Sequence, residues 1–119
     1  MLIHYSTDYV FDGTQPKYAE DAATHPVNFY GESKLKGEEI VLDTSADFAV
    51  LRLPILYGQV EKLSESAVLV LVNQLIERRV QGVDHWAIRS PTSTADIAQA
   101  IDKMIAQHIV APIVQGIYH

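Results

Sequence analysis

Cysteine is absent from this 119-residue sequence, and so is every glycine spacing typical of a phosphate-binding loop. Without cysteine the chain has neither disulfides nor thiolate ligands for a metal. No two of the six glycines are separated by only one or two residues, which excludes both the G-x-G-x-x-G fingerprint and the P-loop. The five histidines are dispersed without a metal-binding spacing, so we expect no metal site.

Basic residues are scarce as well. Nine lysines and arginines against fifteen acidic residues give a net charge of −6, which argues against nucleic acids and anionic membranes as partners. The N-terminus lacks a basic stretch followed by a long apolar run, and the apolar runs elsewhere are too short to span a bilayer. We therefore expect a soluble cytoplasmic protein.

The apolar residues predict alternating strands and helices. Strands are expected over 2–11, 48–56 and 83–88 and from 116 onward, and helices over 29–42, 64–79 and 92–107. Pro54 is expected to end the second strand, because proline cannot donate to a sheet ladder. This order of elements predicts an α/β fold with a parallel sheet.

The helix expected over 29–42 has a weak apolar face. Its polar residues Lys36, Glu38 and Glu39 are expected to point largely to solvent. Gly31 and Gly37 each weaken it by about 1 kcal/mol relative to alanine, so the helix depends on packing against other elements.

Tyr30 and Lys34 are the most informative pair in the chain. Four residues apart, they share one face of this helix, so an ammonium group lies beside a phenol. A nearby positive charge favours the ionised phenol and makes it a better proton donor to a carbonyl that accepts hydride. Thr7, at the end of the first strand, adds a hydroxyl. These are the parts that a nicotinamide-dependent carbonyl reductase needs.

Each of these residues also has a purely structural interpretation. An isolated Tyr-x-x-x-Lys is usually a packed tyrosine beside a solvated lysine. Thr7 can bond to the backbone of its own turn, and Arg52, inside an apolar run, can be half of a structural ion pair. Trp86 is more often a packed anchor than a substrate contact.

Three segments in order resemble the extended short-chain dehydrogenase/reductases, and among them the dTDP-4-dehydrorhamnose reductase branch. They are Ser-Thr-Asp-Tyr-Val-Phe-Asp-Gly at 6–13, Pro-Val-Asn-Phe-Tyr-Gly-Glu-Ser-Lys-Leu-Lys-Gly-Glu at 26–38 and Leu-Arg-Leu-Pro-Ile-Leu-Tyr-Gly at 51–58. Segments 60–68 and 84–92 look closer still to the regulatory β subunits of methionine adenosyltransferase and their bacterial relatives.

The resemblance implies roles for individual residues. Tyr30 matches the proton donor, Lys34 the residue that bonds the nicotinamide ribose, and Thr7 the hydroxyl that holds the substrate carbonyl. Leu53, Pro54 and Ile55 match the strand end that lies against the nicotinamide. The implied cofactor is NADP(H).

The family's glycine-rich turn would precede Met1. We therefore expect residues 1–119 to form a single partial domain, the C-terminal half of a Rossmann-type sheet with part of a small substrate subdomain. Cofactor binding would then require the N-terminal dinucleotide-binding half. An uncovered sheet edge would favour weak stability or self-association.

Three functions are compatible with these features. The first is an NADP-binding regulatory subunit of methionine adenosyltransferase, with the catalytic subunit as partner, in S-adenosylmethionine biosynthesis. The second is NADPH-dependent reduction of a 4-keto nucleotide sugar such as dTDP-4-dehydrorhamnose. The third is a gene fragment without activity of its own.

Overall fold

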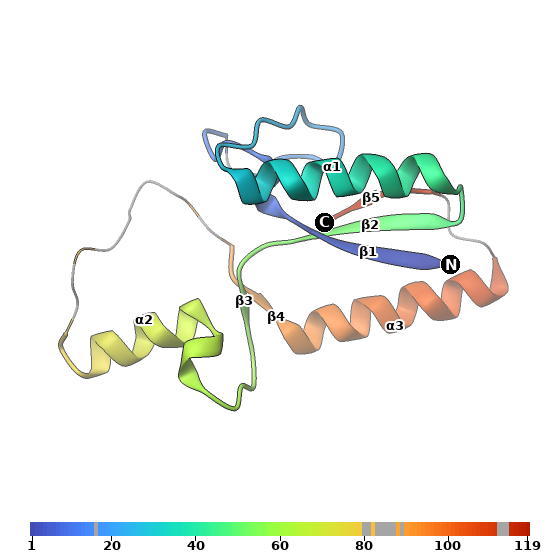
Figure 1. The fold of residues 1–119 in the computed structure, drawn as a ribbon. Helices are drawn as coiled ribbons and strands as arrows, with labels where there is room; N and C mark the ends of the chain where they lie inside the picture. Colours follow the sequence, from blue (N-terminus) through green and yellow to red (C-terminus); the bar gives the residue numbers. More distant parts are fainter. Residues whose placement is uncertain (16, 80–81, 83–87, 89, 112–114) are drawn as a thin grey trace. The chain divides into compact units, whose positions relative to one another are not determined.

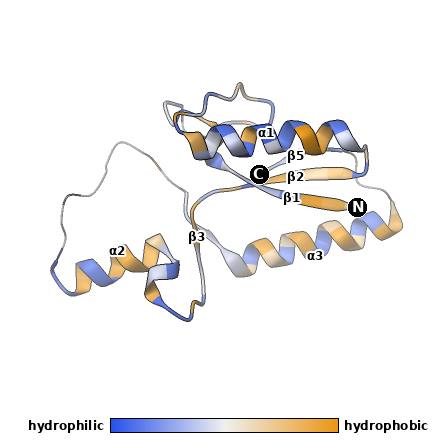
Figure 2. Ribbon diagram, in the orientation of Figure 1, coloured by the Kyte–Doolittle hydropathy of each residue, from blue (hydrophilic) through white to orange (hydrophobic). Residues whose placement is uncertain are grey.

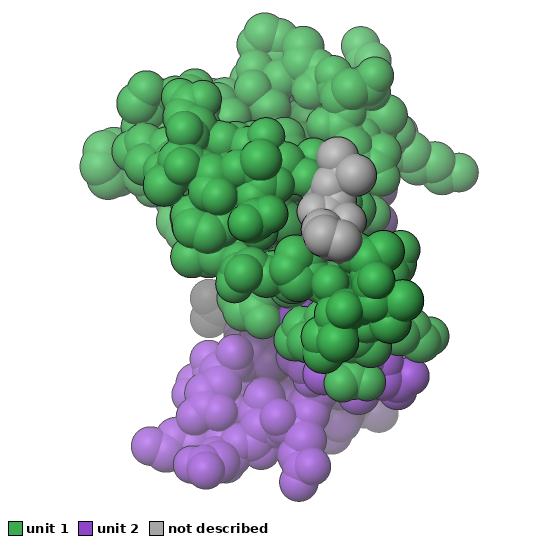
Figure 3. Space-filling view, turned by 90° about the vertical axis from the view of Figure 1, so that its right-hand side faces the viewer, with its two compact units in different colours: residues 1–53, 102–119 green, residues 54–101 purple. Residues whose placement is uncertain are grey.

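The computed structural model describes residues 1–119 except 16, 80–81, 83–87, 89 and 112–114 (Figure 1). Its internal contacts divide the chain into two compact units, one made of residues 1–53 and 102–119 and the other of residues 54–101 (Figure 3). Among the described residues, no helix is both long enough and apolar enough to cross a bilayer.

The first unit is built on a parallel sheet of three strands, β1 (Leu2–Thr7), β2 (Phe48–Leu53) and β5 (Gly116–Tyr118), in the order β1-β2-β5. Strand β2 is in the middle because its apolar run can be buried on both faces. The register places Thr7 opposite Leu53, so these two residues share the carboxyl edge of the sheet. The predicted α/β fold with a parallel sheet is confirmed.

Helix α1 (Phe29–Thr44) connects β1 to β2 and packs on both strands (Figure 1). It begins where predicted because the Asn28 side chain accepts a hydrogen bond from the Gly31 amide at 2.8 Å, an N-cap that satisfies one of the free amides of the first turn. The helix then runs two residues beyond the predicted end. Ser45, in extended conformation, follows it.

The apolar core of the first unit is small. The buried hydrophobic residues are Val10, Phe11, Ala49, Val50 and Leu51. Figure 2 shows the hydrophobic character of β1 and β2 against the more hydrophilic connecting segment that precedes α1. Helix α1 contributes no buried apolar side chain, since its buried residues are Gly31 and Glu38.

The second unit contains a two-stranded parallel pair, β3 (Leu56–Tyr57) with β4 (Thr92–Ser93), a 3-10 turn η2 (Leu63–Glu65) and helix α2 (Ala67–Ile76). Ser66 caps α2, because its hydroxyl accepts from the Leu69 amide at 3.4 Å and donates to the Leu56 carbonyl at 3.3 Å. Helix α3 (Thr94–Val110) begins in this unit and continues into the first.

Several element boundaries differ from the predictions. Strand β1 ends at Thr7 instead of residue 11, because Thr7 caps a 3-10 turn, η1 (Asp8–Val10). The helix predicted over 64–79 is shorter at both ends, and α3 starts two residues later than predicted because Thr92 and Ser93 pair with β3.

Other boundaries agree more closely with the sequence. Strand β2 ends at Leu53, three residues short of the range predicted over 48–56, and directly before Pro54, the residue expected to end it. Strand β5 begins at Gly116 as predicted. The strand predicted over 83–88 and the side chain of Trp86 lie outside the described residues. Of the strands that the structure describes, β1 and β5 pair only with β2. Self-association through a sheet edge stays a prediction.

Candidate functional site

Tyr30 and Lys34 face the same strand and turn from helix α1. The Lys34 ammonium donates a hydrogen bond to the Tyr5 carbonyl of β1 at 2.6 Å. The Tyr30 ring meets the Tyr9 ring of η1 edge to face, with 5.7 Å between their centroids. The four-residue spacing therefore places both side chains on one side of the helix, and the Tyr30 residue is 52% exposed, so it is accessible to a ligand.

Thr7 lies at the carboxyl end of β1, and its hydroxyl serves the turn that follows. The hydroxyl accepts from the Tyr9 amide and approaches an Asp8 carboxylate oxygen, both at 3.3 Å, and the residue is buried. The local interpretation from the sequence is confirmed: Thr7 caps a turn. This cap also holds Tyr9 where the Tyr30 ring contacts it.

Leu53 ends β2 directly beside Thr7 in the sheet register, at the same carboxyl edge. In parallel α/β sheets this edge is where ligands bind. Pro54 and Ile55 follow it and belong to the second unit, and all three residues are partly exposed.

The sequence prediction for Glu38 is wrong. Glu38 is 2% exposed and forms an ion pair with Arg52, with 2.7 Å between the Arg52 Nη2 and a carboxylate oxygen. Arg52 Nε lies 3.0 and 3.2 Å from the two oxygens of the same carboxylate, and the Ser6 hydroxyl donates to it as well. The structural interpretation of Arg52 is confirmed.

Two signals in the sequence point to this burial. Glu38 continues the four-residue spacing of Tyr30 and Lys34, and so it belongs to the face that packs on β1. Arg52 interrupts a buried apolar strand, where a guanidinium needs a partner. Glu39, the neighbour predicted to behave alike, is exposed and pairs with Lys36 at 2.6 Å.

Arg52 also supports the loop that follows η1. Its Nη1 donates to the Glu20 carbonyl at 3.3 Å, and its guanidinium carbon lies 5.0 Å from the centre of the Phe11 ring. Phe11 in turn stacks on Tyr18, with 4.2 Å between the ring centres.

Asp12 organises the start of this loop. Its carboxylate accepts from the Tyr18 hydroxyl at 2.6 Å and from the Thr14 amide and hydroxyl at 2.9 and 2.8 Å. These hydrogen bonds, that of Tyr18 first, lower the pKa of Asp12 to about 2. Asp12 is therefore engaged within its own turn.

His4 lies on β1 beneath α1, next to Gly37, and its Nε2 is buried without a hydrogen-bond partner. Burial lowers the pKa of His4 below 6.5, and the Lys34 ammonium lowers it further, while the Glu38 carboxylate opposes the shift. The folded environment therefore favours the neutral form of the ring.

The shift predicts an acid-dependent loss of stability. The pKa of His4 is lower in the folded chain than in the unfolded chain. Its contribution to the free energy of unfolding is therefore fully present above pH 6.5 and is lost as the pH falls through the folded-state pKa. We expect the melting temperature to drop less between about pH 7.5 and about pH 5.5 in His4→Leu than in the parent chain. The matched control is His25→Gln, at an exposed histidine, which should keep the full drop. An unchanged pH dependence in His4→Leu would refute this prediction.

A second prediction concerns Gly31, beside Tyr30. A methyl group at this position would collide with the Tyr9 carbonyl oxygen and press on Pro26. Gly31→Ala is therefore expected to lower the free energy of unfolding by about 1–3 kcal/mol in urea denaturation. At a helix position with free space around it, glycine to alanine raises the free energy of unfolding by about 1 kcal/mol. A lowered free energy of unfolding in Gly31→Ala would therefore indicate the collision. Gly82→Ala is the neutral control, because among the described residues none lies within 4 Å of the added carbon. A stabilised Gly31→Ala would contradict the prediction.

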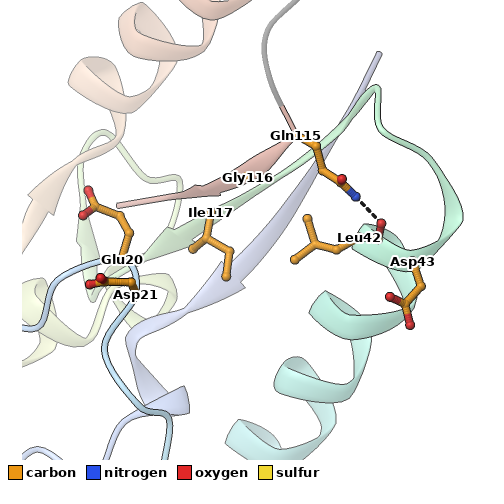
Figure 4. Close-up of a pocket in the computed structure, with 7 residues that line it drawn as sticks. All are labelled: Glu20, Asp21, Leu42, Asp43, Gln115, Gly116 and Ile117. Carbon is orange, nitrogen blue, oxygen red and sulfur yellow. Dashed lines mark hydrogen bonds between the residues drawn. The ribbon is translucent and has the colours of Figure 1, made fainter.

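A surface depression of about 550 Å³ lies elsewhere on the first unit (Figure 4). Figure 4 shows Glu20 and Asp21 on one side of it, Leu42 and Asp43 on the other, and Gln115 bonded to the Leu42 carbonyl. The described residues that line it include three carboxylates and no cation, so this depression does not suit an anionic dinucleotide. Within the described part of the chain, no three histidine, aspartate or glutamate side chains are grouped to hold a metal.

The parallel sheet of three strands, with helix α1 packed on it, is a Rossmann-type α/β arrangement. The model of the RmlD substrate binding domain matches residues 1–119, and the chain belongs to this family. It is similar to methionine adenosyltransferase 2 subunit beta of Xenopus tropicalis, at 46% identity over 99% of this chain and 36% of the relative. The subunit beta of Danio rerio is 45% identical, over 99% of this chain and 37% of the relative.

Reductases are also similar to the chain. A dTDP-4-keto-6-deoxy-D-glucose reductase of Streptomyces niveus is 42% identical over 87% of this chain and 36% of its own length. The solved dTDP-4-dehydrorhamnose reductase of Clostridium acetobutylicum has a TM-score of 0.78 at 30% identity, over 98% of this chain and 39% of that protein. That of Bacillus anthracis, in complex with NADP, has a TM-score of 0.73 at 28% identity, over 98% and 40%. The chain thus spans little more than a third of the proteins it matches.

The donor set fits one end of the family's cofactor, NADP. A phenol and an ammonium on one face of a helix can bond the hydroxyls of a ribose, whereas the Thr7 hydroxyl is buried and already bonds Tyr9 and Asp8. For the pyrophosphate the family uses a glycine-rich turn, and the 119 residues contain no such glycine spacing.

Proposed function

We propose that the chain serves as part of an NADP-binding regulatory subunit of methionine adenosyltransferase, in S-adenosylmethionine synthesis. The observation that carries this proposal is the 46% identity to a subunit beta along 99% of the chain. The match to the Streptomyces reductase extends over less of the chain, at 42% identity over 87%.

In this proposal the Tyr30–Lys34 face binds the cofactor. Lys34 already donates one hydrogen bond to Tyr5, and its ammonium has two further donors to offer a ribose. The accessible Tyr30 ring supplies a hydroxyl one helical turn away. A regulatory role requires this face to bind and orient the cofactor, and it requires no turnover.

The test is association with a methionine adenosyltransferase catalytic subunit. The complete gene product, with NADP present, is expected to co-elute with that subunit in size-exclusion chromatography and to change the kinetics of S-adenosylmethionine formation. A complete protein that neither associates with the catalytic subunit nor changes its kinetics would refute the proposal.

Cofactor binding is tested separately by NADPH titration of the complete protein. Lys34→Met is expected to weaken binding by about tenfold or more, because it removes a charged hydrogen-bond donor. Lys36→Met is the matched control, since Lys36 is exposed on the same helix and pairs with Glu39. Equal affinity of the two variants would exclude Lys34 from the cofactor site. NADPH binding by the 119-residue chain alone would count against a fragment without activity of its own.

NADPH-dependent reduction of a 4-keto nucleotide sugar is the second candidate. The accessible phenol of Tyr30, on the face that Lys34 shares, favours it. NADPH would supply the hydride, Tyr30 the proton and Thr7 a hydroxyl for the substrate carbonyl. NADPH consumption with dTDP-4-dehydrorhamnose distinguishes the two candidates, because a purely regulatory subunit consumes none.

A further inference from the structure

Tyr30, Lys34 and Glu38 follow one another at four-residue intervals along α1. Each interval turns the helix by only about 40° beyond a full turn, so the three side chains form one stripe. The stripe lies on β1 and its following turn: Tyr30 meets the Tyr9 ring, Lys34 the Tyr5 carbonyl, and Glu38 the Ser6 hydroxyl.

Glu38 is the most strongly held member of the stripe. Arg52 approaches its carboxylate with two nitrogens, Nε at 3.0 Å and Nη2 at 2.7 Å. Both side chains of this pair are almost fully buried, at 3% and 2% exposure. Such a two-point pair fixes direction as well as distance, because the guanidinium and the carboxylate are both planar.

The remaining contacts of α1 hold its orientation less firmly. Its apolar side chains Leu35, Val41 and Leu42 are only half-buried, so its apolar face alone holds one rotation weakly. Gly31 lets the first turn approach the Tyr9 carbonyl, but a glycine has no side chain to interlock. The directional contacts in the second half of the stripe are those of Glu38.

Glu38 also joins the two strand ends of the candidate site. Ser6 directly precedes Thr7 on β1, and Arg52 directly precedes Leu53 on β2. One carboxylate therefore sets the position of the helix that carries Tyr30 and Lys34 against both of these residues.

We propose that Glu38 is a positioning residue for the Tyr30–Lys34 pair, acting through Arg52 and Ser6 to fix the rotation and axial position of α1 on the sheet. The inference rests on the proposed function only in taking that pair as the ligand-binding face. Its test measures geometry in the chain without cofactor or partner, so its outcome is independent of whether the proposed function holds.

The experiment separates positioning from stability. Glu38→Gln leaves Arg52 buried without a counter-charge and is expected to lower the melting temperature by about 10–20 °C. The double variant Glu38→Met/Arg52→Met replaces the pair by apolar side chains of similar length and is expected to regain most of that loss. The control is Lys36→Met/Glu39→Met, which removes an exposed pair from the same helix.

Nuclear Overhauser cross peaks between protons of the Tyr9 and Tyr30 rings report whether α1 keeps its position on the sheet. They are expected at full intensity in the parent chain and in the control, and with most of their intensity lost in Glu38→Met/Arg52→Met although it is folded. A double variant that keeps both its melting temperature and these cross peaks would overturn the proposal.

Glu38→Asp is the second test, should the double variant fail to fold. It keeps the charge but withdraws the carboxylate by one methylene, so the chain should fold with weakened cross peaks. Unchanged cross peaks in Glu38→Asp would overturn the proposal as well.

Discussion

Replacing Arg52 by methionine is expected to lower the free energy of unfolding by about 3–5 kcal/mol, a large share of the stability of a domain this size. The substitution leaves the Glu38 carboxylate buried with the Ser6 hydroxyl but without a counter-charge. It also removes the hydrogen bond to the Glu20 carbonyl and the contact with the Phe11 ring. Urea denaturation followed by circular dichroism measures the loss.

Arg79→Met is the matched control. Arg79 also pairs with a glutamate, Glu77, at 3.6 Å, but its side chain is 81% exposed. Exposed pairs contribute about 0–1 kcal/mol, so the control is expected to stay within that range. Equal losses in Arg52→Met and Arg79→Met would show that the buried pair carries no special weight.

Replacing Tyr30 by phenylalanine has the largest expected effect on chemistry. If the complete protein reduces a 4-keto nucleotide sugar, turnover is expected to fall by about 10²- to 10⁴-fold, because the ring stays in place and the proton donor is lost. Full turnover in Tyr30→Phe would exclude the phenol as the acid. The edge-to-face contact with Tyr9 involves only the ring, so the fold should be kept.

NADPH affinity serves as the internal control for Tyr30→Phe. The variant is expected to lose less NADPH affinity than Lys34→Met, because Lys34 keeps its place on the Tyr5 carbonyl and only one hydroxyl of the binding face is removed. A parallel loss of affinity and turnover would point to a displaced helix instead of a lost proton donor. Regulation of a methionine adenosyltransferase, by contrast, should survive the substitution.

The sequence predicted the sheet well because its strands are marked by local chemistry. The apolar run from Phe48 is long enough for a buried strand, and Pro54 ends it. The helix that follows the loop begins at Phe29 as predicted, and the structure shows Asn28 as its cap. The four-residue spacing of Tyr30 and Lys34 likewise predicted that both face one side, which the contacts with Tyr9 and Tyr5 confirm.

The burial of Glu38 and the end of β1 were not predicted, because each depends on which hydrogen-bond partner the folded chain provides. Adjacent glutamates on a helix are usually solvated, and the four-residue spacing that distinguishes Glu38 from Glu39 does not by itself provide a partner for a buried carboxylate. Glu38 is buried because Arg52, fourteen residues further along the chain, reaches it from a neighbouring strand. The early end of β1 has a similar origin: Thr7 can extend a strand or cap a turn, and the turn's hydrogen bond decided between them.

The stripe on α1 has a consequence for how this segment can change over time. One residue inserted between Tyr30 and Glu38 would rotate the rest of the helix by about 100°. The Glu38 carboxylate and the Tyr30 ring could then no longer both face the sheet. A deletion would do the same in the opposite sense. Related chains are therefore expected to keep seven residues between these two positions, even where the amino acids other than Gly31 and Lys34 vary.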